Sequence, residues 1–266
     1  MRLLRTSFPQ ADRVSAPLAP PGTVPLLEID GLCVAFPDAE HDGPVVNRLS
    51  LRVGRGEIVA LVGESGSGKS MTALSLVRLL PPGASITGGS VRLDGEDILR
   101  APAARLNQIR GRRIGMLFQQ PHATLDPTSV VGSQVAEPLR LHRRLGRRAA
   151  WARVIELFRE VGIPEPEHRA RSYAHQLSGG MAQRVMIAAA LAADPDLLIA
   201  DAPTTALDVT VQAQILRLLD RERRERGLSI LLITHDLTVV SAFTDRVAVM
   251  YAGRIVEEGE TGAVLD

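Results

Sequence analysis

The chain has 266 residues, of which 45% are hydrophobic and 23% are charged, and its formal net charge is +1. These values are typical of a globular protein with a full core, and the near-neutral balance gives no electrostatic reason to expect nucleic-acid binding. Its one cysteine, Cys33, excludes an internal disulfide and favours a reducing, cytosolic location. The N-terminus has no apolar segment of signal-peptide length, and no apolar run reaches the ~18 residues that span a bilayer.

The first 25 residues are rich in proline, alanine and arginine, which predicts a disordered lead-in. Strands are then expected over 26–36 and 45–53, because apolar residues recur there at alternate positions. A further strand with a turn is expected over 90–98. These early strands predict an antiparallel β-subdomain beside the core of the protein.

The stretch from Gly63 to Ser70 follows an apolar run and precedes a helical segment. The pattern Gly-x-x-x-x-Gly-Lys-Ser between a strand and a helix is that of a phosphate-binding loop. Its glycines let backbone N–H groups surround phosphates, and the helix N-terminus adds partial positive charge. Lys69 is expected to reach the β- and γ-phosphates of a nucleotide, and the Ser70 hydroxyl to bind Mg²⁺. The loop consists of Gly63, Glu64, Ser65, Gly66, Ser67, Gly68, Lys69 and Ser70.

Helical periodicity begins near Val130 and lasts to about Tyr173, which predicts an inserted helical subdomain over about 126–180. An arginine cluster lies within it, made up of Arg140, Arg143, Arg144, Arg147 and Arg148. This cluster is either a basic docking patch or a solvated helix face. The absence of interleaved aromatic residues favours the solvated face.

The C-terminal half alternates helices with the apolar strands 197–200 and 230–233, which predicts a parallel α/β sheet. The segments 247–250 and 254–257 are expected to pair as a hairpin. We therefore assign the nucleotide core, together with the β-subdomain, to about 26–125 and 181–266.

Two more segments contain polar residues that are candidates for binding a metal or an anion. Asp201 ends an apolar strand, where phosphate-loop enzymes place the carboxylate that holds Mg²⁺. The segment from Leu177 to Gln183 places a serine and two glycines at a helix N-terminus, which is a second anion site.

With these segments in this order, the sequence resembles the ATP-binding-cassette (ABC) ATPases over about residues 26–262. It looks most like the branch that powers oligopeptide, dipeptide and nickel importers. The segments that carry the resemblance are Gly63–Ser70, Phe118–Pro121, Leu177–Gln183, Pro203–Gln214, His235 and Tyr251–Gly259. The resemblance implies a P-loop NTPase core with a parallel sheet, an antiparallel β-subdomain and an inserted α-helical subdomain, which binds ATP and Mg²⁺ over residues 26–266.

The resemblance also implies roles for single residues. Phe36 matches the aromatic residue that stacks on adenine, and a plain core position at a strand end is the alternative. Gln119 matches the residue that touches Mg²⁺ or the attacking water, and His235 the residue that contacts the γ-phosphate. The implied metal ligands are Ser70, Gln119 and Asp201. The residues implied to reach a nucleotide on a partner subunit are Ser178, Gly179, Gly180 and Gln183, with Asp208 at the dimer interface.

One position departs from the family pattern, because Ala202 stands where the family has a glutamate that polarises the attacking water. Alanine has no proton acceptor, and a general base is worth typically ~10²–10⁴ in rate. The sequence therefore predicts a chain that binds MgATP and hydrolyses it poorly at its own loop. Ala202 is either an engineered substitution that traps the ATP state or a natural degenerate site, and the intact motifs elsewhere favour engineering.

The function implied is that of an ABC importer subunit, which couples ATP hydrolysis to the import of peptides or a related small solute such as a nickel chelate. Its implied partners are a second ATPase subunit, two membrane permeases and, indirectly, an extracellular binding protein, at the cytoplasmic face of the membrane. The alternatives are an ABC ATPase that assists a soluble enzyme and a regulatory cassette that senses ATP. The sequence ends at Asp266 without the His-Pro-Tyr-Thr segment frequent in this branch, which leaves no basis for a cluster cofactor.

Overall fold

The computed structural model describes residues 24–36, 43–204 and 208–265. The predicted lead-in lies outside these residues, apart from its last two positions. An antiparallel sheet follows with the strand order β2-β1-β4-β5, as the early strands predicted. Its strands are β1 (Leu27–Ala35), β2 (Val46–Val53), β4 (Ser85–Leu93) and β5 (Glu96–Asp97). The strand with a turn expected over 90–98 is the end of β4, a turn at Asp94 and Gly95, which both have positive φ, and the second short strand β5.

The second sheet has the order β10-β9-β3-β8-β7-β6. Its strands are β3 (Ile58–Val62), β6 (Ile114–Leu117), β7 (Leu197–Asp201), β8 (Ser229–Thr234), β9 (Arg246–Tyr251) and β10 (Arg254–Glu260). All neighbours are parallel except β9 and β10, which form the expected hairpin. Every residue of β3, β7 and β8 is buried. Strands covered on both faces need no polar alternation, which explains their continuous apolar sequences.

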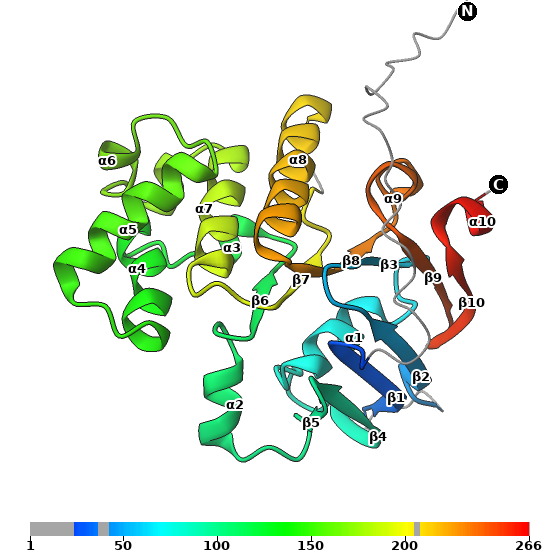
Figure 1. Cartoon of the computed structure of the whole chain (residues 1–266). Coiled ribbons are helices and arrows are strands. Elements are labelled where there is room, and N and C mark those ends of the chain that lie inside the picture. Colours follow the sequence, from blue (N-terminus) through cyan, green and yellow to red (C-terminus); the bar gives the residue numbers. More distant parts are fainter. Residues whose placement is uncertain (1–23, 37–42, 205–207, 266) are drawn as a thin grey trace, which may run out of the picture.

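Helices cover the six-stranded sheet and form one end of the molecule (Figure 1). They are α1 (Lys69–Leu76), α2 (Ala103–Ile109), α3 (Pro121–Thr124), α4 (Val131–His142), α5 (Arg147–Glu160), α6 (Pro166–Arg169), α7 (Gly179–Leu191), α8 (Val209–Arg226), α9 (Leu237–Phe243) and α10 (Thr261–Leu265), with a 3₁₀ turn over Ala174–Gln176. Helices are therefore present where the helical subdomain is predicted, but the boundary predicted at residue 180 falls inside α7. The division into domains stays a prediction. None of the helices within the described residues is both long and apolar enough to cross a bilayer.

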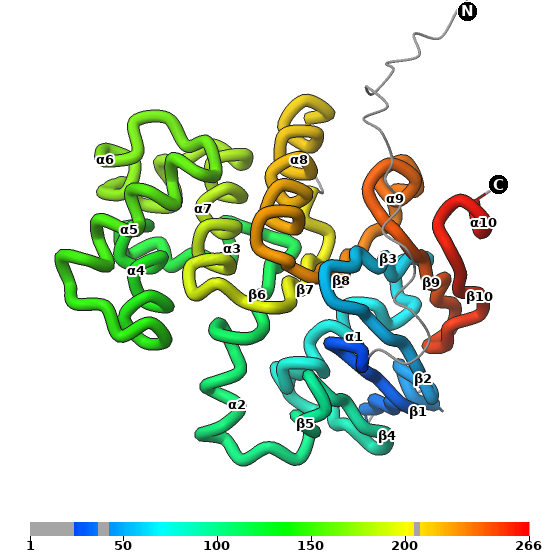
Figure 2. Tube along the Cα trace, in the orientation of Figure 1, coloured from blue at the N-terminus to red at the C-terminus, as the bar shows by residue number. Residues whose placement is uncertain are grey.

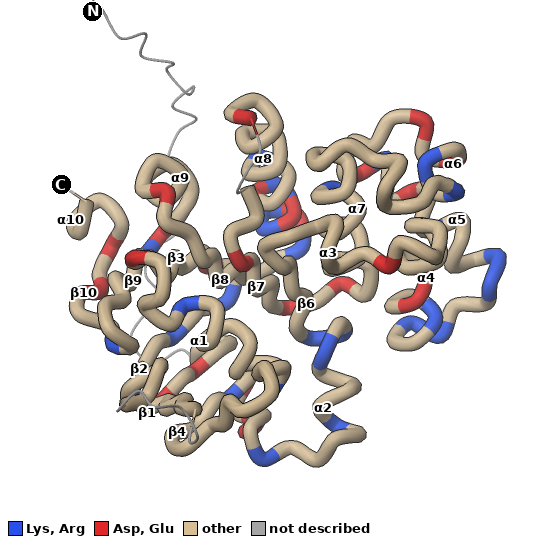
Figure 3. Tube along the Cα trace, turned by 180° about the vertical axis from the view of Figure 1, so that it is seen from behind, with Lys and Arg blue, Asp and Glu red and all other residues tan. Residues whose placement is uncertain are grey.

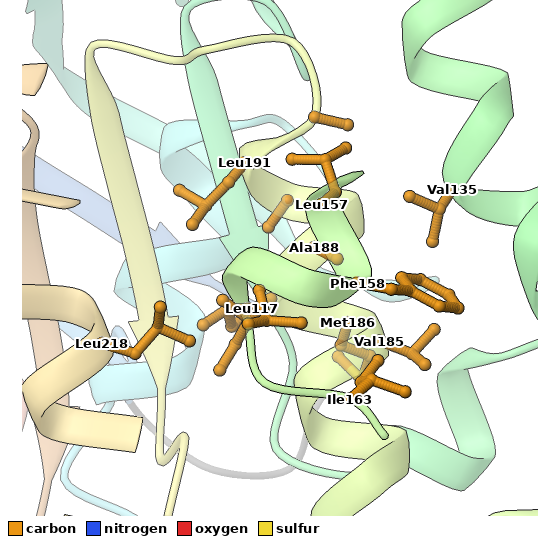
Figure 4. Packing of buried hydrophobic residues seen from close by; sticks show 14 of the residues in the cluster. Leu117, Val135, Leu157, Phe158, Ile163, Val185, Met186, Ala188, Leu191 and Leu218 are labelled. Atoms are coloured by element: carbon orange, nitrogen blue, oxygen red, sulfur yellow. The ribbon is translucent and has the colours of Figure 1, made fainter. Parts of the chain in front are cut away.

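Helix α7 joins the helical end to the sheet. Its residue Val185 belongs to one buried cluster with Phe158 of α5, Leu117 of β6 and Leu218 of α8 (Figure 4). Phe158 and Leu117 are fully buried. Because one continuous core spans α5, α7 and the sheet, burial of this apolar area holds the two parts together.

A second buried cluster joins the antiparallel sheet to the other one. It contains Leu32 of β1, Leu76 of α1 and Leu231 of β8, all with no exposed surface. An early and a late strand of the chain also meet beside this cluster: β2 and β10 lie side by side (Figure 2), and the N–H of Asn47 donates to the carbonyl of Gly253 at 2.8 Å. The helix that follows the phosphate-binding loop is therefore fixed between the two sheets.

Charged side chains tie α8 to its surroundings, and Figure 3 shows basic and acidic segments close together along this helix. Arg226 pairs with Glu160 at 2.9 Å, with Asp194 at 2.7 Å and with the buried Glu222 at 2.9 Å. Glu160 is the last residue of α5 and Asp194 lies between α7 and β7, so this one side chain links three parts of the fold.

The arginine cluster predicted from the sequence lies at the turn between α4 and α5. Arg143 pairs with Asp194 at 2.6 Å. The other four, Arg140, Arg144, Arg147 and Arg148, are exposed and have no ion pair with any described residue. This exposure agrees with the interpretation of the cluster as a solvated helix face.

Candidate functional site

The predicted site residues gather at the carboxyl edge of the six-stranded sheet. Parallel pairing brings Val62 opposite Thr234, Asp201 opposite Ile233, and Ala200 opposite Leu117. The carboxyl ends of parallel strands share one edge of a sheet, and ligands bind there in such folds. The residues placed along this edge are Gly63, Gln119, Asp201, Ala202 and His235.

The phosphate-binding loop, Gly63 to Gly68, lies between β3 and α1 and is packed against neighbouring backbone. Gly66 and Gly68 have φ values of 83° and 105°, which side chains rarely adopt. A Cβ at Gly68 would lie 2.6 Å from the carbonyl oxygen of Val45, and one at Gly63 would lie 2.1 Å from that of Met250. The glycines thus serve close packing as well as phosphate approach. Sequence reasoning missed Val45 and Met250, because they act through backbone atoms that carry no residue-type signal.

Lys69 reaches back into this loop. Its Nζ donates to the carbonyl oxygens of Gly63 at 2.8 Å and Glu64 at 2.7 Å, and to Ser67 Oγ at 3.2 Å. Burial lowers the pKa of Lys69, and the carboxylate of Asp201 opposes this effect. A partly desolvated ammonium held by neutral carbonyls gains from an anion placed within the loop, which is what a nucleotide phosphate would supply.

Asp201 is 8% exposed at the end of β7. Burial raises the pKa of its carboxyl, whereas a hydrogen bond from Ser70 and the charge of Lys69 act to lower it. This contact brings two oxygen atoms together, and Mg²⁺ prefers oxygen ligands with phosphate oxygens completing its shell. No set of three acidic, histidine or cysteine side chains suited to hold a metal occurs within the described residues.

Gln119 and His235 flank this pair and are both exposed. Gln119 follows β6 by two residues, and His235 stands between β8 and α9. Phe36 follows β1 directly and is half-buried. Val34 of β1 pairs with Val46, whose neighbour Val45 lies against Gly68 of the loop, so Phe36 follows β1 at the end of this sheet nearer the loop. Its placement is compatible with a nucleotide base near the loop.

The second anion segment begins α7. The Ser178 side chain accepts the Met181 N–H at 3.3 Å and caps the helix, as its sequence pattern predicts. A Cβ at Gly180 would lie 3.1 Å from Val211 in the first turn of α8. The Asp208 side chain caps α8 by accepting the Val211 N–H at 2.9 Å. The structure therefore brings the two segments implied to face a partner subunit next to each other, while residues 205–207 lie outside its description.

Gln183 differs in burial from the other residues implied to reach a nucleotide on a partner subunit. It is 2% exposed, whereas Ser178 and Gly179 are exposed, because it lies one turn further along α7 on the face that packs into the core. Its Nε2 has no hydrogen-bond partner among the described residues. The predicted contact of Gln183 with a nucleotide on a partner subunit stays a prediction, and it would require this side chain to leave its buried position.

Ala202 lies directly after Asp201, and its side chain is a methyl group at the sheet edge. It is 8% exposed and has a φ of 48°. The position next to the Asp201 carboxylate therefore carries no side-chain group that accepts a proton.

Comparisons with known proteins agree with this geometry. A family profile described as ABC transporter matches residues 46–205. The chain is 48% identical over 244 residues to the probable D,D-dipeptide transport ATP-binding protein DdpD of Escherichia coli (strain K12), which covers 91% of this chain and 74% of that protein. It is 51% identical over 234 residues to the oligopeptide transport ATP-binding protein OppD of Mycobacterium tuberculosis (strain ATCC 25618 / H37Rv), covering 88% of this chain but only 38% of that longer protein.

Solved structures show the same architecture. The ATP-binding cassette MJ0796, in a dimeric post-hydrolysis state bound to ADP and Pi, superposes with a TM-score of 0.80 at 29% identity and covers 88% of this chain and 98% of its own. The protein cbiO1 from Clostridium perfringens, part of the ABC transporter complex cbiONQ, gives a TM-score of 0.77 at 28% identity, covering 91% of each chain. The predicted α/β fold, with parallel and antiparallel sheets, is confirmed by the coordinates and by these neighbours.

Proposed function

We propose, because this chain belongs to the ABC transporter family, that it is the ATP-binding subunit of an importer of peptides or of a related small solute such as a nickel chelate. The observation that carries the proposal is the phosphate-binding loop in which Lys69 Nζ donates to the carbonyl oxygens of Gly63 and Glu64, with Asp201 at the end of β7 on the same sheet edge. These groups match the charge of a Mg²⁺–nucleotide phosphate, and the relatives' names supply the class of transported solute.

The reaction is hydrolysis of the bond between the β- and γ-phosphates by water. The backbone N–H groups of the loop and Lys69 hold the phosphates, and Ser70 and Asp201 would hold Mg²⁺, which would neutralise charge on the phosphate oxygens. Gln119 orients the metal or the attacking water, and His235 donates to the γ-phosphate. Phe36 stacks on the adenine. Positioning and charge stabilisation of this kind supply most of the catalysis of phosphoryl transfer.

Each site is completed by a second ATPase subunit. The exposed Ser178 and Gly179 at the N-terminus of α7, with the adjoining Gly180, bind the γ-phosphate of a nucleotide held by the partner subunit, and Asp208 faces the same interface. ATP therefore joins two subunits, and its hydrolysis releases them. The segment around Gln119 passes this movement to two membrane permeases, with the chain at the cytoplasmic face of the membrane.

Ala202 limits this chain's own site. The methyl group cannot accept a proton from water, so the general-base contribution of ~10²–10⁴ is absent while phosphate and metal binding remain. MgATP therefore stays bound at this site, because its hydrolysis there is slow. In an assembly with a different ATPase chain, turnover would occur at the other site.

The test is whether the chain assembles with permeases and responds to solute. A tagged chain expressed with its neighbouring subunits should co-purify with two permeases in detergent. The complex in lipid vesicles should hydrolyse ATP faster when binding protein and a dipeptide are present, with a nickel chelate as the second solute tested. A soluble, permease-free assembly would instead support an ATPase that assists an enzyme. Tight ATP binding with no turnover and no transport would support a regulatory cassette.

A further inference from the structure

The turn that carries His235 is fixed mainly by its neighbour Asp236. The Asp236 N–H donates to Thr234 Oγ1 at 3.1 Å, across His235. Its Oδ1 accepts the N–H groups of Thr238 at 2.9 Å and Val239 at 3.3 Å, which caps α9. Asp236 therefore joins the end of β8 to the start of α9, and His235 is the residue between its two attachments.

The other carboxylate oxygen of Asp236 accepts a bond from a different element. Gln212, in the first turn of α8, donates its Nε2–H to Asp236 Oδ2 at 3.1 Å. The N–H of Gln212 donates in turn to the carbonyl of Asp208 at 2.9 Å, so the residue is fixed by its own helix. Gln212 is half-buried, and its bond to Asp236 contributes to the lowered pKa of that carboxyl. The Asp236 carboxylate is thus held on both oxygens, one by α9 and one by α8.

The first turn of α8 also touches the segment that begins α7. Val211, the residue before Gln212, lies against Gly180, where a Cβ would approach to 3.1 Å. Gly180 belongs to the segment proposed to meet the nucleotide of a partner subunit, whereas His235 is proposed to meet the nucleotide of its own subunit. Gln212 stands between these two contacts.

We propose that Gln212 is a positioning residue that orients His235 toward the γ-phosphate through its hydrogen bond to Asp236. This inference rests on the proposed function. Without the bond, Asp236 keeps its attachment to α9, and the His235 turn loses its side-chain bond to α8. The γ-phosphate contact then weakens, while contacts to the α- and β-phosphates, which the loop from Gly63 to Ser70 makes, are unaffected.

The test compares the affinities of the purified full chain for ATP and for ADP in the presence of Mg²⁺, by titration calorimetry. Gln212→Glu keeps the shape but places a carboxylate against Asp236, and Gln212→Leu removes the donor without adding charge. Both should lower ATP affinity by about tenfold, as expected for losing one charge-assisted hydrogen bond in a site, and leave ADP affinity unchanged. Gln214→Glu is the matched control, because Gln214 is exposed on the same helix and accepts from Arg184 instead.

A purely structural role would lower the affinities for ATP and for ADP in parallel, and that result would overturn the proposal. The double variant Gln212→Glu with His235→Ala should lose no more ATP affinity than His235→Ala alone, because one contact carries both effects. Fully additive losses would also overturn it. If the unaltered chain binds no nucleotide, the proposed function fails; if it prefers ATP and Gln212→Glu retains that preference, only this inference fails.

Discussion

The backbone N–H of Ala202 donates to the carbonyl oxygen of Ile233 at 2.8 Å, which attaches the residue after β7 to β8. Ala202 has a left-handed conformation, with a φ of 48°. A longer side chain at this position would therefore start from a fixed Cα, at the sheet edge that Gln119 and His235 also occupy. Position 202 therefore lacks a proton acceptor because its side chain is a methyl group, and its backbone lies at the sheet edge.

Restoring a carboxylate should restore hydrolysis. In the ATPase complex, Ala202→Glu should raise the rate of phosphate release at this site by ~10²–10⁴, because the carboxylate accepts a proton from the attacking water. Ala202→Gln is the control, since it has nearly the same shape and accepts no proton at neutral pH. Equal rates for the glutamate variant and the original chain would contradict the assignment of Ala202 as limiting.

Lys69 is the only lysine in the chain, so its chemistry can be followed without interference. Because burial lowers its pKa below the ordinary 10.5, a larger fraction is uncharged at a given pH than for an exposed lysine. Acetylation of Lys69 with a small reagent should therefore follow an apparent pKa below 10.5, as measured by mass spectrometry of the peptide that contains it.

MgATP should protect Lys69 from this reaction, since the phosphates would replace the Gly63 and Glu64 carbonyls as partners of its ammonium group. The α-amino group, read from a separate peptide, serves as the internal control and should react equally with and without nucleotide. Equal labelling of Lys69 in both conditions would place the phosphates elsewhere.

Asp201 should destabilise the nucleotide-free protein when ionised. Its pKa is raised above the ordinary 3.8, so the folded chain binds this proton more tightly than the unfolded chain does. The free energy of unfolding therefore increases as the pH falls through the raised pKa that Asp201 has in the folded chain, and the increase is complete below 3.8, the ordinary pKa of the unfolded chain. It decreases again as the pH rises. Asp201→Asn should be more stable than the original chain at pH 7, and the difference should shrink as the pH approaches 4.

The measurement is urea unfolding of both proteins across this pH range without nucleotide. The same variant should lose Mg²⁺-dependent ATP binding, since an amide does not replace the negative charge of a carboxylate as a metal ligand. Lower stability of Asp201→Asn at pH 7 would show that the carboxylate is compensated within the protein alone.

Arg226 should contribute more to stability than any exposed arginine of α8. Arg226→Ala removes ion pairs to three acids, one of which, Glu222, is 3% exposed and would be left without this partner. Loss of one partner from a buried charge is costly, and we expect a decrease of about 2–4 kcal/mol in the free energy of unfolding by urea. Arg224→Ala is the control: Arg224 is 64% exposed and pairs only with Asp220, so its loss should cost about 0–1 kcal/mol. Similar losses for both variants would contradict a central role for Arg226.

The sequence alone was enough to predict the phosphate-binding loop, the positions of the apolar strands along the chain and the lack of a proton acceptor at Ala202. Each of these depends on residue type at neighbouring positions: glycine where φ is positive, unbroken apolar runs where a strand is covered on both faces, and a serine or aspartate where a helix begins. Such local requirements can be read from the sequence, and the structure contains the corresponding elements.

Tertiary structure decided the remainder. Gln183 follows Gly179 and Gly180 closely in sequence, yet it is buried, because successive residues of α7 point to different faces of the helix. The approach of Val45 to Gly68 and the bond from Gln212 to Asp236 join residues far apart in the chain. These contacts result from the packing of sheets and helices, and they cannot be predicted from the spacing of residues in the sequence. The sequence thus determined which groups the candidate site contains, and the packing determined which of them are exposed at the sheet edge and which are buried.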